Sequence, residues 1–251
     1  MIDMGMPKSI LIILVLPIVL AFGLTLLAPE SSVVEKTDDP QVRACSGKKN
    51  AGISPAEDLM REHGLLERIL LIYGEIAKRL ESGREFPPET LSAAADITRI
   101  CIEEYHGKLE EEYIFPFFEK AGPKVDLVKV LRDQHAAGRR LTDDIRARAN
   151  AETLRKPDER KKLSALLFTF IFMYRPHAAR EDTVLFPAVR GIVPAEEFDN
   201  LRGIFEQRET DLFGAGGFEK QVGHITELEK TLGISDLAQF TPPWGRKKQG
   251  K

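Results

Sequence analysis

Two short stretches of the sequence each place a histidine four residues before a glutamate. In EEYHGKLEEEYIFPFF, His106 precedes Glu110. In RPHAAREDTVLFPAV, His177 precedes Glu181. The stretches align without gaps, because an acidic residue at plus five and Phe-Pro at plus nine and plus ten follow both histidines. Residues four apart share one face of an α-helix, so each stretch offers an imidazole and a carboxylate one turn apart.

Two further histidines stand at matching places earlier in the chain. His63 precedes His106 by 43 residues, and His135 precedes His177 by 42 residues. Each half therefore reads as a helical hairpin, with a histidine on its first helix and His-x-x-x-Glu on its second. A pseudo-twofold bundle of these hairpins would bring six side chains to one level: His63, His106, Glu110, His135, His177 and Glu181.

Such a group of buried ionisable side chains requires compensation. A single histidine on an apolar stripe is ordinarily a core residue, but six coordinated placements would each cost several kcal/mol without a partner. Arg139 and Arg180 could neutralise one glutamate each, which leaves four imidazoles unexplained. A metal centre compensates all six groups. Imidazole and carboxylate donors suit iron, manganese or zinc, and six ligands exceed what one tetrahedral zinc uses. We therefore expect two metal ions, with Glu110 and Glu181 as bridges.

Four amphipathic helices are predicted to position these residues. The first begins with Ser54 as N-cap and Pro55 at the first helical position, and the others cover about 89–118, 125–149 and 157–187. Each of the four histidines falls on an apolar stripe of helical period. No strand alternation is present, so we expect an all-α protein built on an up-down-up-down four-helix bundle. The aromatic residues Phe168, Phe170 and Phe172 are expected to pack this bundle, and His224 to lie on the surface.

The chain is predicted to divide into four segments. Residues 1–29 form an N-terminal membrane anchor or signal-like segment, and residues 30–53 form a tether. Residues 54–190 form the four-helix bundle. Residues 191–251 form a helical extension, with helices at about 194–213 and 218–232, and a tail.

Residues 10–28 carry no charge and, as a helix, would span about 28 Å, close to the thickness of a bilayer core. A cleaved signal peptide is the alternative, but no Ala-x-Ala precedes a cleavage point and Pro29 follows the run. We expect a single-pass transmembrane anchor that places the folded domain outside the cytoplasm.

Composition narrows the classes of partner. The formal net charge is -3 and no extended basic region is present, which argues against a nucleic-acid partner. The two cysteines, Cys45 and Cys101, form no CxxC motif, so a zinc site built on thiolates is excluded. Outside the cytoplasm these cysteines could form a disulfide; two free thiols are the alternative.

The order His, His-x-x-x-Glu, His, His-x-x-x-Glu on four helices resembles the hemerythrin family, in the broad form called the HHE cation-binding domain. The Phe-Pro pair after each motif is also typical. The resemblance covers roughly 54–189, or extends further through the fifth helix, and implies a non-haem di-iron centre that binds dioxygen or a relative such as nitric oxide. It makes the four histidines terminal ligands and the two glutamates bridging ligands. A ferritin-like bundle fits less well, because it needs Glu-x-x-His on two helices and only Glu103-x-x-His106 matches.

Two positions differ from the oxygen-carrying hemerythrins. Those proteins have a further histidine four residues after the third-helix histidine, where this chain has Arg139. They also use an aspartate at plus five on the fourth helix, where Asp182 stands. Helix geometry favours Glu181, about 40° from His177 around the axis, over Asp182 at about 140°. Asp182, Glu111 and Glu62 are reserve ligands.

Three functions remain open from the sequence. The first is a di-iron module that binds or senses dioxygen or a related small molecule, or stores iron. The second is a di-iron enzyme that handles peroxide or nitric oxide. The third is a metal-stabilised scaffold whose helices after Pro187 contact an unknown protein partner.

Overall fold

The computed structural model describes residues 53–242. The predicted anchor at 10–28, its membrane orientation and Cys45 lie outside the described residues and stay predictions. Within the described part of the chain, no helix is long and apolar enough to cross a membrane. Cys101 is buried in the bundle.

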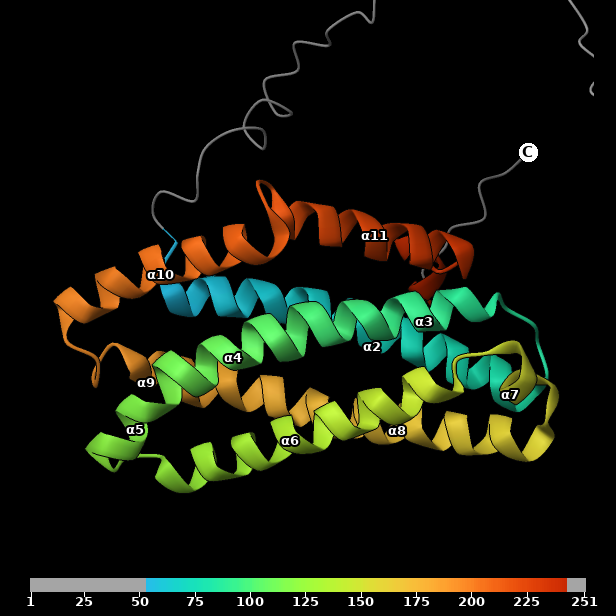
Figure 1. Cartoon of the computed structure of the whole chain (residues 1–251), viewed down its shortest axis with the longest axis horizontal. Coiled ribbons are helices and arrows are strands. Elements are labelled where there is room, and N and C mark those ends of the chain that lie inside the picture. Colours follow the sequence, from blue (N-terminus) through green and yellow to red (C-terminus); the bar gives the residue numbers. More distant parts are fainter. Residues whose placement is uncertain (1–52, 243–251) are drawn as a thin grey trace, which may run out of the picture. The chain divides into compact units, whose positions relative to one another are not determined.

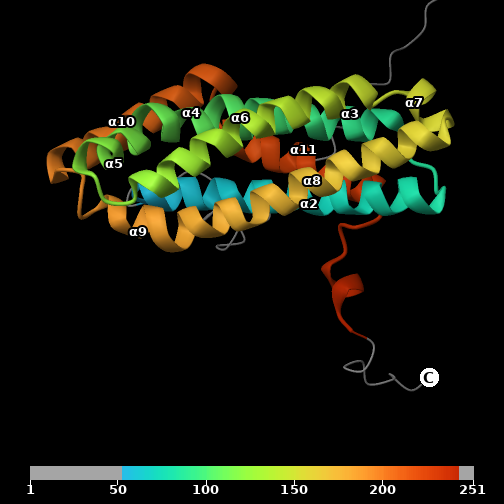
Figure 2. The same cartoon turned by 90° about the horizontal axis from the view of Figure 1, so that it is seen from below.

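Four long helical runs, each antiparallel to the next, form the bundle (Figures 1 and 2). The first is α2 (Pro55–Ser82) and the third is α6 (Val125–Arg148). The second run comprises α3 (Pro88–Ile97), the π-helical η1 (Thr98–His106), α4 (Gly107–Leu109), the π-helical η2 (Glu110–Ile114) and α5 (Phe115–Ala121). The fourth comprises α8 (Pro157–Arg180), the π-helical η3 (Glu181–Leu185) and α9 (Phe186–Val189). No strand occurs between residues 53 and 242, which confirms the all-α prediction.

The start of α2 matches its prediction. The Ser54 hydroxyl accepts from the Glu57 backbone N–H at 3.3 Å, and the Glu57 carboxylate accepts from the Ser54 backbone N–H at 2.7 Å. This reciprocal capping box satisfies two helix-end donors. Pro55 occupies the first turn, where its missing N–H costs nothing.

Two details of the bundle were not predicted correctly. The connection between α6 and α8 contains an extra short helix, α7 (Ala151–Arg155), capped by the Asn150 side chain. Phe172 was expected to pack inside the bundle but is 74% exposed. Phe170 is buried, and residues two apart on an α-helix point to nearly opposite sides.

The C-terminal extension packs along one side of the bundle. α10 (Ala195–Phe213) and α11 (Gly217–Thr231) lie against α2 and the second helical run (Figure 1). The short 3₁₀ helix η4 (Leu237–Phe240) follows. The Arg68 guanidinium on α2 pairs with the Glu229 carboxylate on α11 at 2.6 Å, which fixes this helix to the bundle.

The buried apolar side chains form two clusters. One contains Leu66, Leu70 and Phe170, and the other contains Leu59, Phe115 and Phe186. Along α2, α6 and the fourth run, the predicted site residues fall between members of the two clusters. The bundle therefore encloses a polar layer between two apolar ones, which shields that layer from water.

Candidate metal centre

The structure brings all six predicted site residues into that polar layer. Each is buried, with no more than 4% of its surface exposed: His63, His106, Glu110, His135, His177 and Glu181. They come from all four runs of the bundle, one histidine per run. The helical periodicity of the sequence is what places them at a common level.

Each glutamate lies between two histidines from different hairpins. Glu110 Oε2 is 3.5 Å from His106 Nε2 and 3.3 Å from His135 Nε2. Glu181 Oε2 is 3.3 Å from His63 Nε2 and 3.2 Å from His177 Nε2. The arrangement consists of two imidazole pairs, each pair reached by both carboxylates.

The donor atoms form two overlapping groups, in each of which they lie within 4.8 Å of one another. One group contains Glu110, His135, His177 and Glu181, and the other contains His63, His106 and Glu181. Glu181 belongs to both groups. This geometry suits two neighbouring metal ions that share a carboxylate.

Unpaired polar atoms also indicate a metal. His63 Nε2, His106 Nε2 and both carboxylate oxygens of Glu110 and Glu181 are buried and make no hydrogen bond to any described residue. Such atoms are uncommon in folded proteins, since each one costs about 1–3 kcal/mol or more. Imidazole nitrogen and carboxylate oxygen are donors that iron, manganese and zinc accept, so the residues present fit a metal.

Each histidine turns its second ring nitrogen outward, to an oxygen on another helix. The four Nδ1 contacts are His63 to Asp182 at 2.7 Å, His106 to Glu62 at 2.8 Å, His135 to Glu111 at 3.1 Å and His177 to Gln134 at 2.9 Å. Because these oxygens accept, Nδ1 carries the proton and Nε2 presents its lone pair to the centre. We call these four oxygen-bearing residues the outer ring. Such contacts orient metal-binding histidines and raise their basicity.

The reserve ligands therefore lie in the outer ring and not between the imidazole pairs. Each of them accepts a hydrogen bond from the Nδ1 of a histidine: Glu62, Glu111 and Asp182. Gln134 was missed in the sequence because an amide beside a histidine is not distinctive. Its position in the repeat could have indicated it, because Gln134 directly precedes His135 as Glu62 directly precedes His63.

Neighbouring acids serve different purposes because they lie on different faces of their helical run. The plus-four glutamates, Glu110 and Glu181, share a face with the histidine before them. The plus-five residues point about 100° further round the helix, toward a histidine of a neighbouring run. Glu110 reaches the centre while Glu111 reaches His135, and Glu181 and Asp182 divide in the same way.

Arg139, which stands where oxygen carriers have another histidine, does not enter the centre. Its Nη2 lies 2.5 Å from Glu111 Oε1, the oxygen that also accepts from His135 Nδ1. Its position beside the outer ring supplies a positive charge that, with other contacts, lowers the pKa of Glu111 despite the opposing effect of burial. Glu111 is therefore ionised when it holds His135.

Charge among the side chains of the centre is unevenly distributed. Burial lowers the pKa of His106 to about 4. Burial also disfavours protonated His63, but its hydrogen bond to Asp182 and the nearby Glu181 carboxylate outweigh that effect and raise its pKa to about 10. A cation that binds His63 must displace this proton, so metal uptake is expected to release protons.

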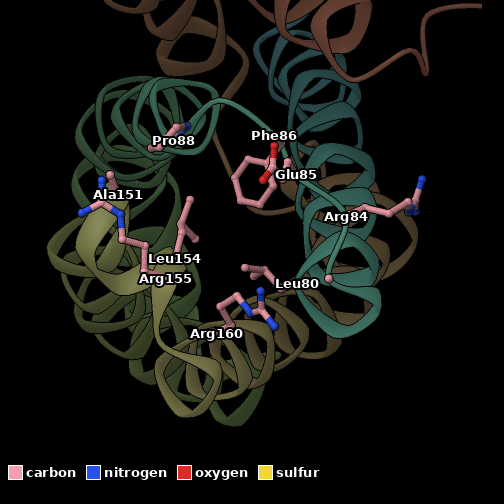
Figure 3. Close-up of a pocket in the computed structure, with 10 residues that line it drawn as sticks. Leu80, Arg84, Glu85, Phe86, Pro88, Ala151, Leu154, Arg155 and Arg160 are labelled. Carbon is pink, nitrogen blue, oxygen red and sulfur yellow. The ribbon is translucent and has the colours of Figure 1, made fainter.

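Other candidate positions lie away from the centre. A surface pocket of about 370 Å³ opens where α2 ends and α7 begins, and Figure 3 shows Leu80, Phe86 and Leu154 around it. None of its lining residues belongs to the centre or the outer ring. His224 is exposed on α11, as predicted.

Comparison with known families agrees with this geometry. The family described as Hemerythrin HHE cation binding domain matches residues 54–189. The chain belongs to the hemerythrin HHE cation-binding family. This membership confirms the resemblance that was noted in the sequence. The matched region ends at Val189, the last residue of α9.

Relatives of this hemerythrin-family chain occur in mycobacteria. It is 46% identical over 190 residues to Uncharacterized protein Rv1995 of Mycobacterium tuberculosis (strain ATCC 25618 / H37Rv) and to Uncharacterized protein Mb2018 of Mycobacterium bovis. The alignments cover 76% of this chain and 74% of each relative. No solved structure gives a significant match. The family and the cluster together support cation binding by this hemerythrin domain.

Proposed function

We propose that the domain holds a non-haem di-iron centre that binds or senses dioxygen or a related small molecule, or stores iron. The observation that carries this proposal is the pair of buried carboxylates whose unpartnered oxygens lie between two imidazole pairs. His63 and His106 would hold one ion, and His135 and His177 the other. Glu110 and Glu181 would bridge them. Iron bound there would supply reversible redox chemistry with dioxygen or its relatives.

Iron is favoured over the other candidate ions by the donor set. No described cysteine lies among the grouped donors, and the mixed imidazole and carboxylate ligands are those of non-haem iron sites. Zinc in a structural site takes four ligands, usually with thiolates, and would leave donors unused. Manganese and zinc remain the ions against which iron must be tested.

The protein's own residues would restrict what reaches the metal. The two apolar clusters exclude bulk water, and Phe186 and Phe115 stack on the rings of His63 and His135 at centroid distances of 5.6 Å. The outer ring keeps each Nδ1 protonated, so that each Nε2 remains available to a cation. A small, weakly polar molecule suits such a site better than a bulky or charged one.

A di-iron enzyme that handles peroxide or nitric oxide is the second candidate. Arg139 supplies no ligand to the centre because its guanidinium pairs with Glu111. The ion held by His135 and His177 would then have fewer protein nitrogens than in the oxygen carriers. A metal with an open position can polarise or activate a bound reactant.

Metal analysis of the purified full chain tests the centre. We expect two iron ions per chain in the wild type, with a sharp loss in His106→Ala and in His177→Ala. His224→Ala is the matched control, because that histidine is exposed. Circular dichroism checks that each variant is folded. An unchanged iron content in both His106→Ala and His177→Ala would exclude this site.

Absorption spectra then distinguish the two candidates. A reversible spectral change between nitrogen and air, without turnover, indicates a binding or sensing domain. Sustained consumption of hydrogen peroxide or nitric oxide with an added electron donor indicates an enzyme. The histidine variants should lose whichever behaviour the wild type shows.

A further inference from the structure

One member of the outer ring is only partly used by its histidine. Glu62 Oε2 accepts from His106 Nδ1 at 2.8 Å. The second oxygen, Glu62 Oε1, is buried and makes no hydrogen bond to any residue of the described chain. The whole residue is 3% exposed, so bulk water does not hydrogen-bond this oxygen, and burial without a partner is energetically costly.

A small cavity lies beside Glu62, under the C-terminal helices. It has a volume of about 10 Å³, close to the space of one water molecule. Its walls come from α2, η1, α10 and α11, and include Glu62, Cys101, Glu209, Phe213, Phe218 and Gln221. The cavity therefore lies between a buried carboxylate of the outer ring and the turn that joins α10 to α11. We call this turn, residues 214–216, the elbow.

Glu209 lines this cavity, and Asp58 and Glu219 share its ion-pair partner Arg61. Asp58 and Glu209 are partly exposed, and Glu219 is 70% exposed at its side chain. The only described cation that an ion pair brings to all three is Arg61, at 3.0 Å, 4.0 Å and 3.8 Å respectively. Since a single guanidinium faces three carboxylates, the region between this surface and the cavity carries excess negative charge, while burial raises the pKa of Glu62 at its inner end. We call this region the passage.

The elbow over the passage is held by a few contacts. The Phe218 backbone N–H donates to Glu209 Oε1 at 3.1 Å, and the Arg61 guanidinium lies 3.9 Å from the centre of the Phe218 ring. Gly214 and Gly216 both have positive φ, at 72° and 67°, a conformation that glycine adopts readily. The turn at the elbow therefore depends on glycine, and few side-chain contacts hold it.

On the side of the centre where Glu111 contacts His135, two cations flank the outer-ring carboxylate. Glu111 pairs with both Lys108 and Arg139, at 2.8 Å and 2.5 Å. A metal ion approaching His135 from that side would meet two positive charges. Glu62 pairs with no lysine or arginine of the described chain, so the two sides of the centre differ in their suitability for cations.

We propose that a divalent cation enters the centre through the α10–α11 elbow. It passes from the carboxylates of Asp58 and Glu209 to the free oxygen of Glu62, and from there past the ring of His106 to its Nε2. Small divalent cations favour oxygen ligands during such a transfer. This inference rests on the proposed function, because it requires that the centre takes up metal. It also gives the C-terminal helices a role in loading.

Stopped-flow uptake of Co²⁺ by the metal-free full chain tests the route, with absorbance as the readout. Glu209→Gln removes a charge while its amide oxygen still accepts from Phe218, and should slow uptake at least about threefold. Arg61→Gln removes the competing cation and loosens the elbow, and should accelerate both uptake and removal by a chelator. Glu227→Gln, exposed on α11, is the matched control and should load at the wild-type rate.

All of these proteins should reach the same final Co²⁺ content, because none of the changes touches a proposed ligand. Wild-type rates in both Glu209→Gln and Arg61→Gln, at full Co²⁺ content, would overturn the route and leave the metal centre standing. A control that slows as much as Glu209→Gln would also overturn it. A wild-type chain that retains no metal would instead refute the proposed function and the route with it.

Discussion

Each imidazole of the centre is held by a side chain from a neighbouring helical run. Glu62 on the first run holds His106 on the second, and Glu111 on the second holds His135 on the third. Gln134 on the third run holds the fourth-run histidine, and Asp182 on the fourth holds the first-run histidine. The outer ring is therefore a closed cycle in which every run both gives and receives one contact.

Arg139 is the residue whose replacement tests this cycle most directly. Arg139→Leu removes the positive charge that helps keep Glu111 ionised and in contact with His135. Loss of a contact that orients a ligand typically weakens metal binding about 10–100-fold. We expect a decrease in this range, measured by competition with a chelator of known affinity.

The neighbouring residue provides the control for that experiment. Arg140→Leu removes an exposed arginine one position along α6 and should leave metal affinity unchanged. Equal weakening in both variants would mean that general surface charge, and not the contact with Glu111, governs binding.

At the scale of the helices, α6 and α8 approach each other closely near the centre. Gly138 on α6 faces Tyr174 on α8, and a Cβ atom at position 138 would lie 2.1 Å from the phenol oxygen. The Tyr174 ring lies edge-on to His177, with centroids 5.3 Å apart. The spacing of these two helices is thus linked to the position of a proposed ligand.

Gly138→Ala should force α6 and α8 apart. Insertion of a methyl group into a packed core typically costs about 1–3 kcal/mol, so the free energy of unfolding should fall by that amount. Urea denaturation measures the change. Gly203→Ala is the control, because nothing lies within 4 Å of the added methyl group on α10. That variant should gain about 0.5–1 kcal/mol from improved helix propensity. A Gly138→Ala protein as stable as the wild type would show that the two helices adjust freely.

The plus-five acids show where helix periodicity stops being informative. Asp182 and Glu111 lie well away from the face of the preceding histidine, as an α-helix would place them, and each contacts a histidine of a neighbouring run. The sequence does not show which run lies beside that face, because this depends on how the four runs pack.

For the whole domain, a bound metal should contribute substantially to stability. Without a cation, the centre leaves several imidazole and carboxylate atoms buried and unpartnered. A ligand present at 100 times its dissociation constant stabilises the fold by about 2.7 kcal/mol, which for a domain of this size is about 5–10 °C in melting temperature. Removal of metal with a chelator should lower the melting temperature by this amount.

Differential scanning calorimetry of loaded and stripped protein measures that shift. His106→Ala serves as the comparison, because a centre that no longer retains metal should show almost no response to the chelator. A stripped wild type with an unchanged melting temperature would indicate that the bundle does not depend on the ion.

Much of the molecule could be predicted from its sequence, for identifiable reasons. The helix-capping residues predicted the start of α2, and the helical spacing of His63, His106, His135 and His177 placed them at one level of the bundle. Gln134 could not be found, because its importance depends on which helix lies beside α6. The packing of α10 and α11 was equally inaccessible, since an amphipathic face does not indicate which surface it covers.

The closed outer ring has a consequence for how the centre can be assembled. Within each hairpin only one histidine finds its oxygen partner: His106 with Glu62 in the first, His177 with Gln134 in the second. The other two histidines, His63 and His135, find theirs across the pseudo-twofold axis. Neither hairpin therefore contains a complete set of oriented imidazoles, and both must dock in register before any one metal position is finished.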